Sequence, residues 1–330
     1  MLTKEQYLDT TAEPENLKET SFLQDVLNGL RSHPKKLDSK YFYDQEGDRL
    51  FQKIMGSEEY YVTKCEAEIF QRYANEIATA LRDRFESFDL VELGAGDASK
   101  TIHLLKQLKH LDCDFQYIPI DISHSIIEYL EQGLPEKLQG LIVKGLNGDY
   151  LEMLNKAVKL SAGNKVVMFL GSNIGNMNTT EAIKFLKKVR ATLNKGDRML
   201  IGFDLKKDPS TILAAYNDSS GYTRAFNLNL LKRINRELGA DFELHQFDHF
   251  PTYDPISGSC RSFLVSKQQQ NVRLANEVFG FNEGEVIYME LSQKYDLPEI
   301  KAMGESCGFR TTEVFMDSRN WFVDTIWECI

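Results

Sequence analysis

A glycine-rich turn near residue 94 is the part of the sequence best suited to hold a ligand. Glu92-Leu93-Gly94-Ala95-Gly96 follows a short apolar segment and precedes a run with helical spacing. Glycines at a strand-to-helix turn let the backbone bend tightly and approach a bound molecule. The third glycine of a dinucleotide fingerprint would fall at Ser99, which is not a glycine. The turn therefore predicts an adenosine cofactor that is not a dinucleotide.

Acidic residues accompany this turn, and they would repel a pyrophosphate. Glu92 lies close enough to the turn to favour a cationic methionyl group. Asp121 ends the next expected strand, where a carboxylate can accept hydrogen bonds from both ribose hydroxyls. Asp149 follows the third strand, where it can accept from an adenine amino group, with Tyr150 packing on the ring. Ordinary turn and helix-capping roles are the alternative for Gly94, Asp121 and Asp149. The expected ligand is S-adenosylmethionine, and the residues expected to bind it are Glu92, Gly94, Gly96, Lys100, Asp121, Asp149 and Tyr150.

The segments that position these residues alternate between strands and helices. Strands are expected at 89–93, 115–121, 141–145, 165–171 and 197–204. Helices are expected at 100–108, 123–132 and 180–193. This alternation predicts βαβ units and a parallel sheet. The chain ends in two strands, 311–317 and 322–329, that predict an antiparallel hairpin. A parallel sheet ending in such a hairpin is typical of class I, Rossmann-like methyltransferases rather than dinucleotide dehydrogenases.

The rest of the chain predicts a second, α+β domain. Near the N-terminus, a helical stripe is formed by Phe22, Val26, Leu27 and Leu30. After Pro209 the parallel pattern breaks, and we expect a helix over 209–240 and a β-rich stretch over 242–290, with its first strand at 242–250. We therefore expect a methyltransferase domain of residues 63–208 and 293–330. The substrate-binding domain is expected to comprise residues 1–62 and the insertion 209–292.

Composition narrows the class of protein further. The 330 residues carry a net charge of −10, which disfavours generic nucleic-acid binding. The five cysteines form no C-x-x-C pair and the six histidines have no metal-ligand spacing, so we expect no metal site and no disulfide framework. The N-terminus lacks an apolar signal core, and no stretch approaches the roughly 18 apolar residues of a spanning helix. We expect a cytoplasmic monomer that acts on a small molecule, with no nucleic-acid or membrane partner.

Several motifs outside the cofactor turn resemble one known family. They are Tyr41-Phe42-Tyr43-Asp44, Glu59-Tyr60-Tyr61-Val62-Thr63-Lys64-Cys65-Glu66, Gly171-Ser172-Asn173-Ile174-Gly175-Asn176, Gly202-Phe203-Asp204-Leu205-Lys206-Lys207-Asp208-Pro209, Ala215-Tyr216-Asn217-Asp218 and Phe226-Asn227-Leu228-Asn229. In this order they resemble the histidine-specific N-alpha-methyltransferases of ergothioneine biosynthesis, from about residue 20 to the end. The resemblance implies methylation of the α-amine of a free amino acid. L-Histidine is the expected substrate and N,N,N-trimethylhistidine (hercynine) the expected product.

The resemblance also implies roles for individual residues. Tyr43 matches a tyrosine that lies near the substrate amine. Tyr60 and Asn176 match residues that hold the amine and carboxylate end of the amino acid, and Tyr216 matches another carboxylate contact. Tyr43 and Asn176 are therefore the expected catalytic residues, because they would orient the nitrogen that is methylated.

A Glu-x-Ser pair, Glu290 and Ser292, matches the pair that hydrogen-bonds the imidazole in this family. Alternation along a strand places both side chains on one face, so both can reach one ring. One position departs from the family pattern, because Ser262 aligns with a methionine that lines the ring pocket. Methylation of another amino acid or of the imidazole ring therefore remains an alternative. The alternatives from other classes are a non-catalytic binding protein and an NAD-type oxidoreductase.

Overall fold

The structure is a computed structural model that describes residues 15–83, 85–160 and 163–330. The chain divides into two units, each built from segments that are far apart in the sequence. The smaller unit comprises residues 15–57, Tyr216–Thr252 and Arg261–Glu290. The larger unit comprises Glu58–Ala215, Tyr253–Cys260 and Leu291–Ile330. The larger unit thus includes residues 58–62, 209–215, 253–260 and 291–292, which the sequence analysis placed in the other domain.

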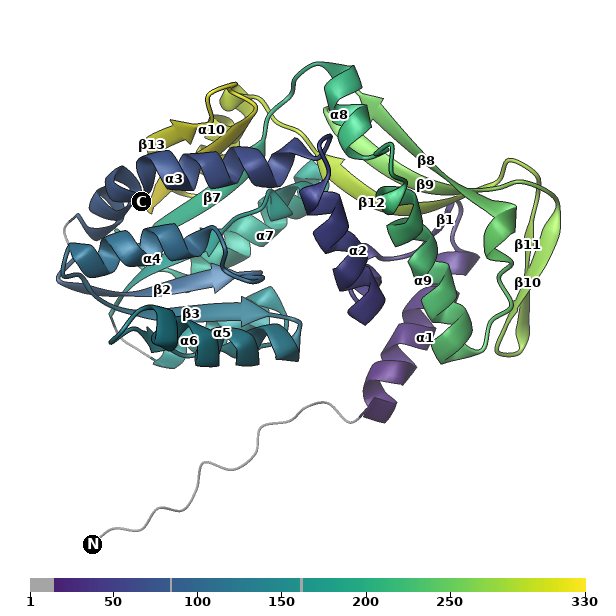
Figure 1. Cartoon of the computed structure of the whole chain (residues 1–330), viewed down its shortest axis with the longest axis horizontal. Coiled ribbons are helices and arrows are strands. Elements are labelled where there is room, and N and C mark those ends of the chain that lie inside the picture. Colours follow the sequence, from purple (N-terminus) through teal and green to yellow (C-terminus); the bar gives the residue numbers. More distant parts are fainter. Residues whose placement is uncertain (1–14, 84, 161–162) are drawn as a thin grey trace, which may run out of the picture. The chain divides into compact units, whose positions relative to one another are not determined.

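One mostly parallel sheet forms the centre of the larger unit (Figure 1). Its strand order is β13-β14-β7-β6-β2-β3-β4, and β5 also pairs with β3. The strands are β2 (Ser87–Leu93), β3 (Asp114–Asp121), β4 (Ile142–Val143), β5 (Leu146–Asn147), β6 (Asn164–Phe169), β7 (Arg198–Asp204), β13 (Phe309–Met316) and β14 (Phe322–Cys329). Strands β2 to β7 pair in parallel, whereas β14 is antiparallel to both β7 and β13. The predicted parallel sheet with a terminal antiparallel hairpin is confirmed, and this is the class I methyltransferase fold.

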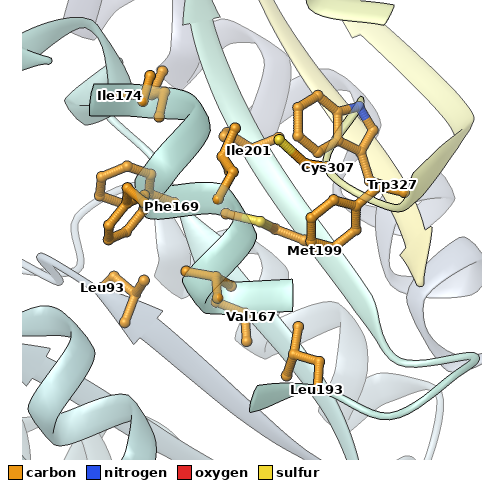
Figure 2. Packing of buried hydrophobic residues seen from close by; sticks show 14 of the residues in the cluster. Leu93, Val167, Phe169, Ile174, Leu193, Met199, Ile201, Cys307 and Trp327 are labelled. Carbon is orange, nitrogen blue, oxygen red and sulfur yellow. The ribbon is translucent and has the colours of Figure 1, made fainter. Parts of the chain in front are cut away.

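Helices on one face of this sheet close its main apolar core. They are α6 (Tyr150–Leu160), α7 (Thr179–Thr192) and α10 (Leu297–Ser306). Figure 2 shows Met199 and Ile201 of β7 lying near Cys307, at the end of α10, and Trp327 of the hairpin, with Phe169 of β6 farther along the same cluster. Strands buried on both faces carry continuous apolar runs, which is why 165–171 and 197–204 were recognisable in the sequence.

The remaining helices of this unit are α3, α4, α5 and α8. Helix α3 (Tyr61–Arg82) contacts α4 (Thr101–His110) and β14, whereas α5 (His124–Lys137) packs on β3. Because β2, β3, β6 and β7 are parallel, the loops that follow them meet at one edge of the sheet. These loops carry most of the predicted cofactor residues. In the part of the chain that the structure describes, no helix is long and apolar enough to cross a bilayer.

The smaller unit contains the N-terminal helices and most of the β-rich insertion. Its elements are α1 (Glu15–Arg31), β1 (Lys35–Lys36), η1 (Ser39–Phe42), α2 (Gln45–Gly56), α9 (Tyr222–Leu238), η3 (Leu244–Gln246), β10 (Gln270–Leu274) and β11 (Glu277–Phe281). A four-stranded sheet has the order β1-β12-β9-β8. The boundaries between the units fall within β8 (Phe247–Asp254), β9 (Ser259–Ser266) and β12 (Val286–Gln293).

Three local expectations are corrected by the structure, and three further elements were not predicted. The helix expected over 209–240 is two helices, α8 (Pro209–Ala215) and α9, because the Asp218 carboxylate accepts from the backbone N–H groups of Tyr222 and Thr223 and so starts a new helix. The strand expected at 242–250 begins at Phe247, after the short helix η3. The strand expected at 141–145 is the two short strands β4 and β5. Helices α2 and α6 and strand β11 were not predicted.

Candidate active site

The predicted cofactor turn follows β2 with the backbone that only glycine adopts readily. Gly94 has φ +75° and Gly96 has φ +52°. A Cβ atom on Gly94 would lie 2.8 Å from the Tyr150 Oη atom and 3.0 Å from Asn173 Nδ2, so the turn is packed closely on this side. A Cβ on Gly96 would meet no atom within 4 Å, which leaves open space beside the second glycine.

Asp121 connects this turn to the loop after β3. One carboxylate oxygen accepts from the Gly96 backbone N–H at 3.1 Å, and the other accepts from the Ser123 N–H at 2.9 Å. A carboxylate has about four lone-pair positions. Each oxygen of Asp121 therefore keeps acceptor capacity after these bonds are made. Its side chain is half-buried beside the turn, which fits an acceptor for ribose hydroxyls.

Asp149 and Tyr150 begin helix α6. The Asp149 carboxylate is exposed and accepts from the Leu151 N–H at 2.9 Å, so it caps the helix, which is the alternative role considered for it. Its second oxygen has the chemistry to accept from an amino group. Tyr150 packs edge-on against Phe169 with ring centroids 5.6 Å apart, and its hydroxyl lies against Gly94. Burial raises the pKa of Tyr150, so the phenol stays neutral.

Glu92 lies beneath the turn rather than at its surface. The side chain is fully buried, and its two oxygens accept hydrogen bonds from the hydroxyls of Thr101 and Tyr117. Strand alternation turns the carboxylate into the protein interior. Burial raises the pKa of Glu92 to about 7, despite these two donors. This carboxylate therefore lies below the turn, and its expected proximity to a cationic methionyl group stays a prediction.

Lys100 connects the cofactor turn to helix α3. Its ammonium pairs with the fully buried carboxylate of Glu66, whose other oxygen accepts from the Gly171 N–H at 2.6 Å. Burial alone would lower the pKa of Lys100, but the charge and hydrogen bond of Glu66, together with the charges of Asp324 and Glu92, raise it overall, so Lys100 stays cationic. Asp324 lies nearby, and burial together with the charge of Glu66 raises its pKa well above the ordinary value. In the sequence, Glu66 stands only as the last residue of the motif 59–66, and that place in the motif was the available signal.

The larger unit also holds three of the predicted substrate residues. Tyr60 is the half-buried N-cap residue of α3, and Asn176 is exposed at the end of η2 (Asn173–Asn176), after β6. Ser292 is buried near the end of β12, where its Oγ accepts from Lys294 Nζ at 2.8 Å. Gly175 approaches this strand closely, since a Cβ there would lie 2.8 Å from the Gln293 carbonyl oxygen. The structure thus brings the Gly171–Asn176 loop and the end of β12 together.

Tyr43, Tyr216, Ser262 and Glu290 belong to the smaller unit. The ring of Tyr43 is 39% exposed and contacts Phe51 and Phe226, with centroids 5.7 and 5.6 Å away. Tyr216 is buried before α9, and Glu290 is half-buried on β12. These side chains come from an N-terminal loop, the turn after α8 and the two strands β9 and β12, which only folding brings into one unit.

Ser262 is buried on β9 and forms a hydrogen bond with His249. The Ser262 Oγ atom lies 3.3 Å from His249 Nε2. Burial lowers the pKa of His249 to about 4, so the imidazole is neutral. Its Nδ1 atom is buried and has no hydrogen-bond partner among the residues that the structure describes. This position is therefore more polar than the methionine of the family pattern.

Among residues 15–83, 85–160 and 163–330, no group of three His, Cys, Asp or Glu side chains could hold a metal ion. The turn at Gly94, the acceptors Asp121 and Asp149 and the cation Lys100 instead fit a nucleoside cofactor with an amino-acid tail. Open space beside Gly96 gives such a molecule room to lie along the backbone.

Comparison with known proteins decides the family. A family model described as "Histidine-specific methyltransferase, SAM-dependent" matches residues 22–329. The chain belongs to this family. The predicted family, the methyltransferase class and the cofactor S-adenosylmethionine are thereby confirmed.

Relatives of this SAM-dependent methyltransferase cover most of its length. The histidine N-alpha-methyltransferase of Mycolicibacterium smegmatis is 35% identical over 297 residues, which is 89% of this chain and 90% of that protein. The Mycobacterium tuberculosis protein of the same name is 34% identical over 274 residues, covering 82% of this chain and 84% of its own. The L-tryptophan methyltransferase of Psilocybe serbica is 25% identical over 341 residues, covering 95% of both chains.

Replacing Gly94 with alanine is expected to weaken cofactor binding by at least about tenfold, or about 1.4 kcal/mol. The added Cβ would meet Tyr150 Oη at 2.8 Å, and the positive φ disfavours any side chain. Titration calorimetry with S-adenosylhomocysteine measures the change. Gly133→Ala is the control, because a Cβ there meets nothing within 4 Å in helix α5. Equal affinities for the two variants would contradict this view of the turn.

Glu92 is expected to make the stability of the protein depend on pH between about 4.5 and 7. Its pKa is raised from 4.5 to about 7 in the folded state, so the stabilisation is fully present below 4.5 and is lost as the pH rises through 7. The change amounts to about 3 kcal/mol. The melting temperature of Glu92→Gln, relative to wild type, should therefore rise from pH 5 to pH 8. Glu136→Gln, at an exposed position, should show a flat difference, and a flat difference for Glu92→Gln would count against a buried titrating carboxyl.

Proposed function

We propose that this protein transfers methyl groups from S-adenosylmethionine to the α-amine of free L-histidine, ending at N,N,N-trimethylhistidine. The observation that carries the proposal is the match to curated histidine N-alpha-methyltransferases at 34–35% identity over more than four fifths of both chains. The curated relative from Schizosaccharomyces pombe is named an ergothioneine biosynthesis protein, which agrees with hercynine as the product. The larger unit carries the residues predicted to hold the cofactor, and the smaller unit carries Tyr43, Tyr216 and Glu290, which match substrate-binding residues of the family.

The residues at the sheet edge would hold the cofactor. Asp121 would accept from the ribose hydroxyls, Asp149 from the adenine amino group, and Lys100 would face the carboxylate of the methionyl tail. The glycines at 94 and 96 would let the backbone lie against it. When bound, S-adenosylmethionine supplies a methyl group on a cationic sulfur. The task of the chain is then to place a nitrogen lone pair in line with that group, which is worth several orders of magnitude in rate.

The substrate amine must be neutral to react. Amines of this kind titrate near pH ~7.7–8 in peptides and higher in a free amino acid, so a proton must leave. Tyr43 and Asn176 would orient the nitrogen, while Tyr60 and Tyr216 would hold the carboxylate. Water would take the proton, since none of these side chains is a strong base. Neutral groups around the nitrogen would also tolerate the fixed positive charge of the trimethylated product.

Glu290 and Ser292 would recognise the imidazole, because they are two positions apart on β12. The Ser262–His249 pair favours a variation on this proposal in which the substrate is an amino acid other than histidine. A polar wall in place of a methionine suits a side chain with a further hydrogen-bonding group, so another amino acid is the second candidate substrate. A relative named L-tryptophan methyltransferase supports keeping a second candidate substrate.

Mass spectrometry of the products formed from each of the twenty amino acids with S-adenosylmethionine tests the proposal. We expect L-histidine to gain three methyl groups at its α-nitrogen and to have the highest kcat/KM. Turnover of a different amino acid would reject histidine and keep the enzyme class. Cofactor binding without methylation of any amino acid would reject the activity altogether.

Glu290→Ala is expected to lower kcat/KM for histidine by about 10²-fold, because a site built to hydrogen-bond the ring loses its acceptor. The fall in kcat/KM should appear mainly as a higher KM, since the ring lies away from the reacting nitrogen. Steady-state release of S-adenosylhomocysteine measures both constants. Glu283→Ala, which removes an exposed glutamate from the turn before β12, is the matched control and should leave both constants unchanged.

A further inference from the structure

Two buried carboxyl groups of the larger unit face one glycine near the carboxyl end of β7. This glycine, Gly202, lies opposite Asp324 of β14 in the antiparallel register. A Cβ atom on Gly202 would lie 2.6 Å from Glu66 Oε1 and 2.9 Å from Asp324 Oδ1. Glu66 extends from α3, and both carboxyl side chains are fully buried. The missing side chain of Gly202 therefore leaves the space in which these two oxygens approach each other.

Hydrogen-bond donors are distributed unequally between these two carboxyl groups. Glu66 Oε1 accepts from the Gly171 N–H at 2.6 Å, and Glu66 Oε2 pairs with the ammonium of Lys100. Neither oxygen of Asp324 has a hydrogen-bond partner among the residues that the structure describes. Donors favour the charged form of a carboxyl group, whereas burial without donors favours the neutral form. The contacts thus favour a charged Glu66, whose Oε1 has a second lone pair, and a protonated Asp324.

Two charged groups from other elements act on Asp324, namely Glu66 on α3 and Lys100 at the start of α4. Burial and the charge of Glu66 raise the pKa of Asp324 well above its ordinary value, and the charge of Lys100 opposes them. Glu92, on β2, acts on Lys100 as well. Glu66 contributes most to raising the pKa of Lys100, so a neutral Asp324 leaves this ammonium its main counter-charge.

The other neighbours of this site keep one charge state between pH 5 and 9. Phe315, opposite Asp324 on β13, does not titrate. Burial raises the pKa of Cys65, on α3, to about 12, so the thiol stays neutral. Arg319, in the turn of the hairpin, donates to the Cys65 sulfur at 3.2 Å. Burial alone would raise the pKa of Asp317, but backbone N–H donors lower it overall, so this carboxylate stays charged.

We propose that Asp324 is a protonated positioning residue that donates a hydrogen bond to Glu66, so that the two carboxyl groups present a single negative charge to Lys100. This inference rests on the proposed function, in which Lys100 faces the carboxylate of the methionyl tail. A lysine ammonium has three donors, and a single counter-charge leaves it able to attract a second anion. A second charged carboxylate beside Lys100 would repel that tail. Cofactor affinity therefore depends on the proton of Asp324.

Carbon-13 NMR of protein labelled at the aspartate γ-carboxyl carbon detects this proton directly, and glutamates such as Glu92 stay silent. At pH 7.5 we expect wild type to show a resonance at the position of a protonated carboxyl group that Asp324→Asn lacks. In Glu66→Gln, Asp324 should ionise and replace Glu66 as the counter-charge of Lys100, so this resonance should move to the carboxylate position. A charged Asp324 in wild type, or a protonated one in Glu66→Gln, would overturn the inference.

Titration calorimetry with S-adenosylhomocysteine measures the effect on the cofactor site. Asp324→Asn is neutral and keeps a donor for Glu66, so its Kd at pH 7.5 should stay within about threefold of wild type, whereas Asp324→Leu lacks a donor and its Kd should rise about tenfold. From pH 6 to 9.5, the wild-type Kd should rise only where the Asp324 resonance moves to the carboxylate position, and Asp324→Asn should lack that rise. Equal Kd values for the two variants, an equal rise in Asp324→Asn, or ionisation without a rise would contradict the positioning role.

Asp197→Asn separates positioning from stability. Asp197 is buried just before β7, at the other end of that strand from the cofactor loops, and accepts from the Lys165 N–H at 2.9 Å. This control should lower the melting temperature and leave the Kd and its pH profile unchanged.

Lys100→Met tests the proposed place of Lys100, and its Kd for S-adenosylhomocysteine should rise at least about tenfold. An unchanged Kd would overturn that place and the positioning role with it. Absence of histidine methylation, with the NMR and calorimetry results as expected, would reject the proposed substrate and leave this inference standing.

Discussion

The buried carboxylate of Glu66 joins separate elements of the larger unit. It extends from α3, pairs with Lys100 at the start of α4 and accepts from the Gly171 N–H after β6. A carboxylate without water must be paired and hydrogen-bonded. The positions of the helix, the cofactor turn and the loop after β6 therefore depend on one another. This constraint fixes the loops at the carboxyl ends of the parallel strands. The predicted cofactor residues lie in those loops.

A second buried cluster follows the same physical rule farther along the edge. Asp204 pairs with Lys207 and Lys294 and accepts from the Tyr61 hydroxyl, and Lys294 in turn donates to Ser292. In both clusters the cost of burying charge is offset by contacts that leave few alternative arrangements. Methyl transfer needs little from acid or base groups but much from alignment. Rigid, fully paired supports beneath the loops suit that requirement.

Much of the fold could be predicted from the sequence because its signals are local. Continuous apolar runs identified β6 and β7, which are buried on both faces, and the terminal hairpin followed from two strands and a short turn. The errors arose where a single polar contact overrides periodicity. Asp218 starts α9 and so divides a continuous helical pattern into two helices. Helix α6 was not predicted, although helix capping was considered as the alternative role of Asp149, which caps it.

The sequence by itself determined the glycine turn, Asp121 and the order of the family motifs, since each depends on residue type and spacing along a few neighbouring positions. Only the tertiary structure decided that Glu92 lies beneath the turn. It also decided that Glu66 pairs with Lys100 beside the turn and that Lys294 donates to Ser292. These three side chains are charged groups whose partners lie far away in the chain. Their burial and pairing exist only once the strands and helices have packed, and no local pattern reveals which charges will be enclosed.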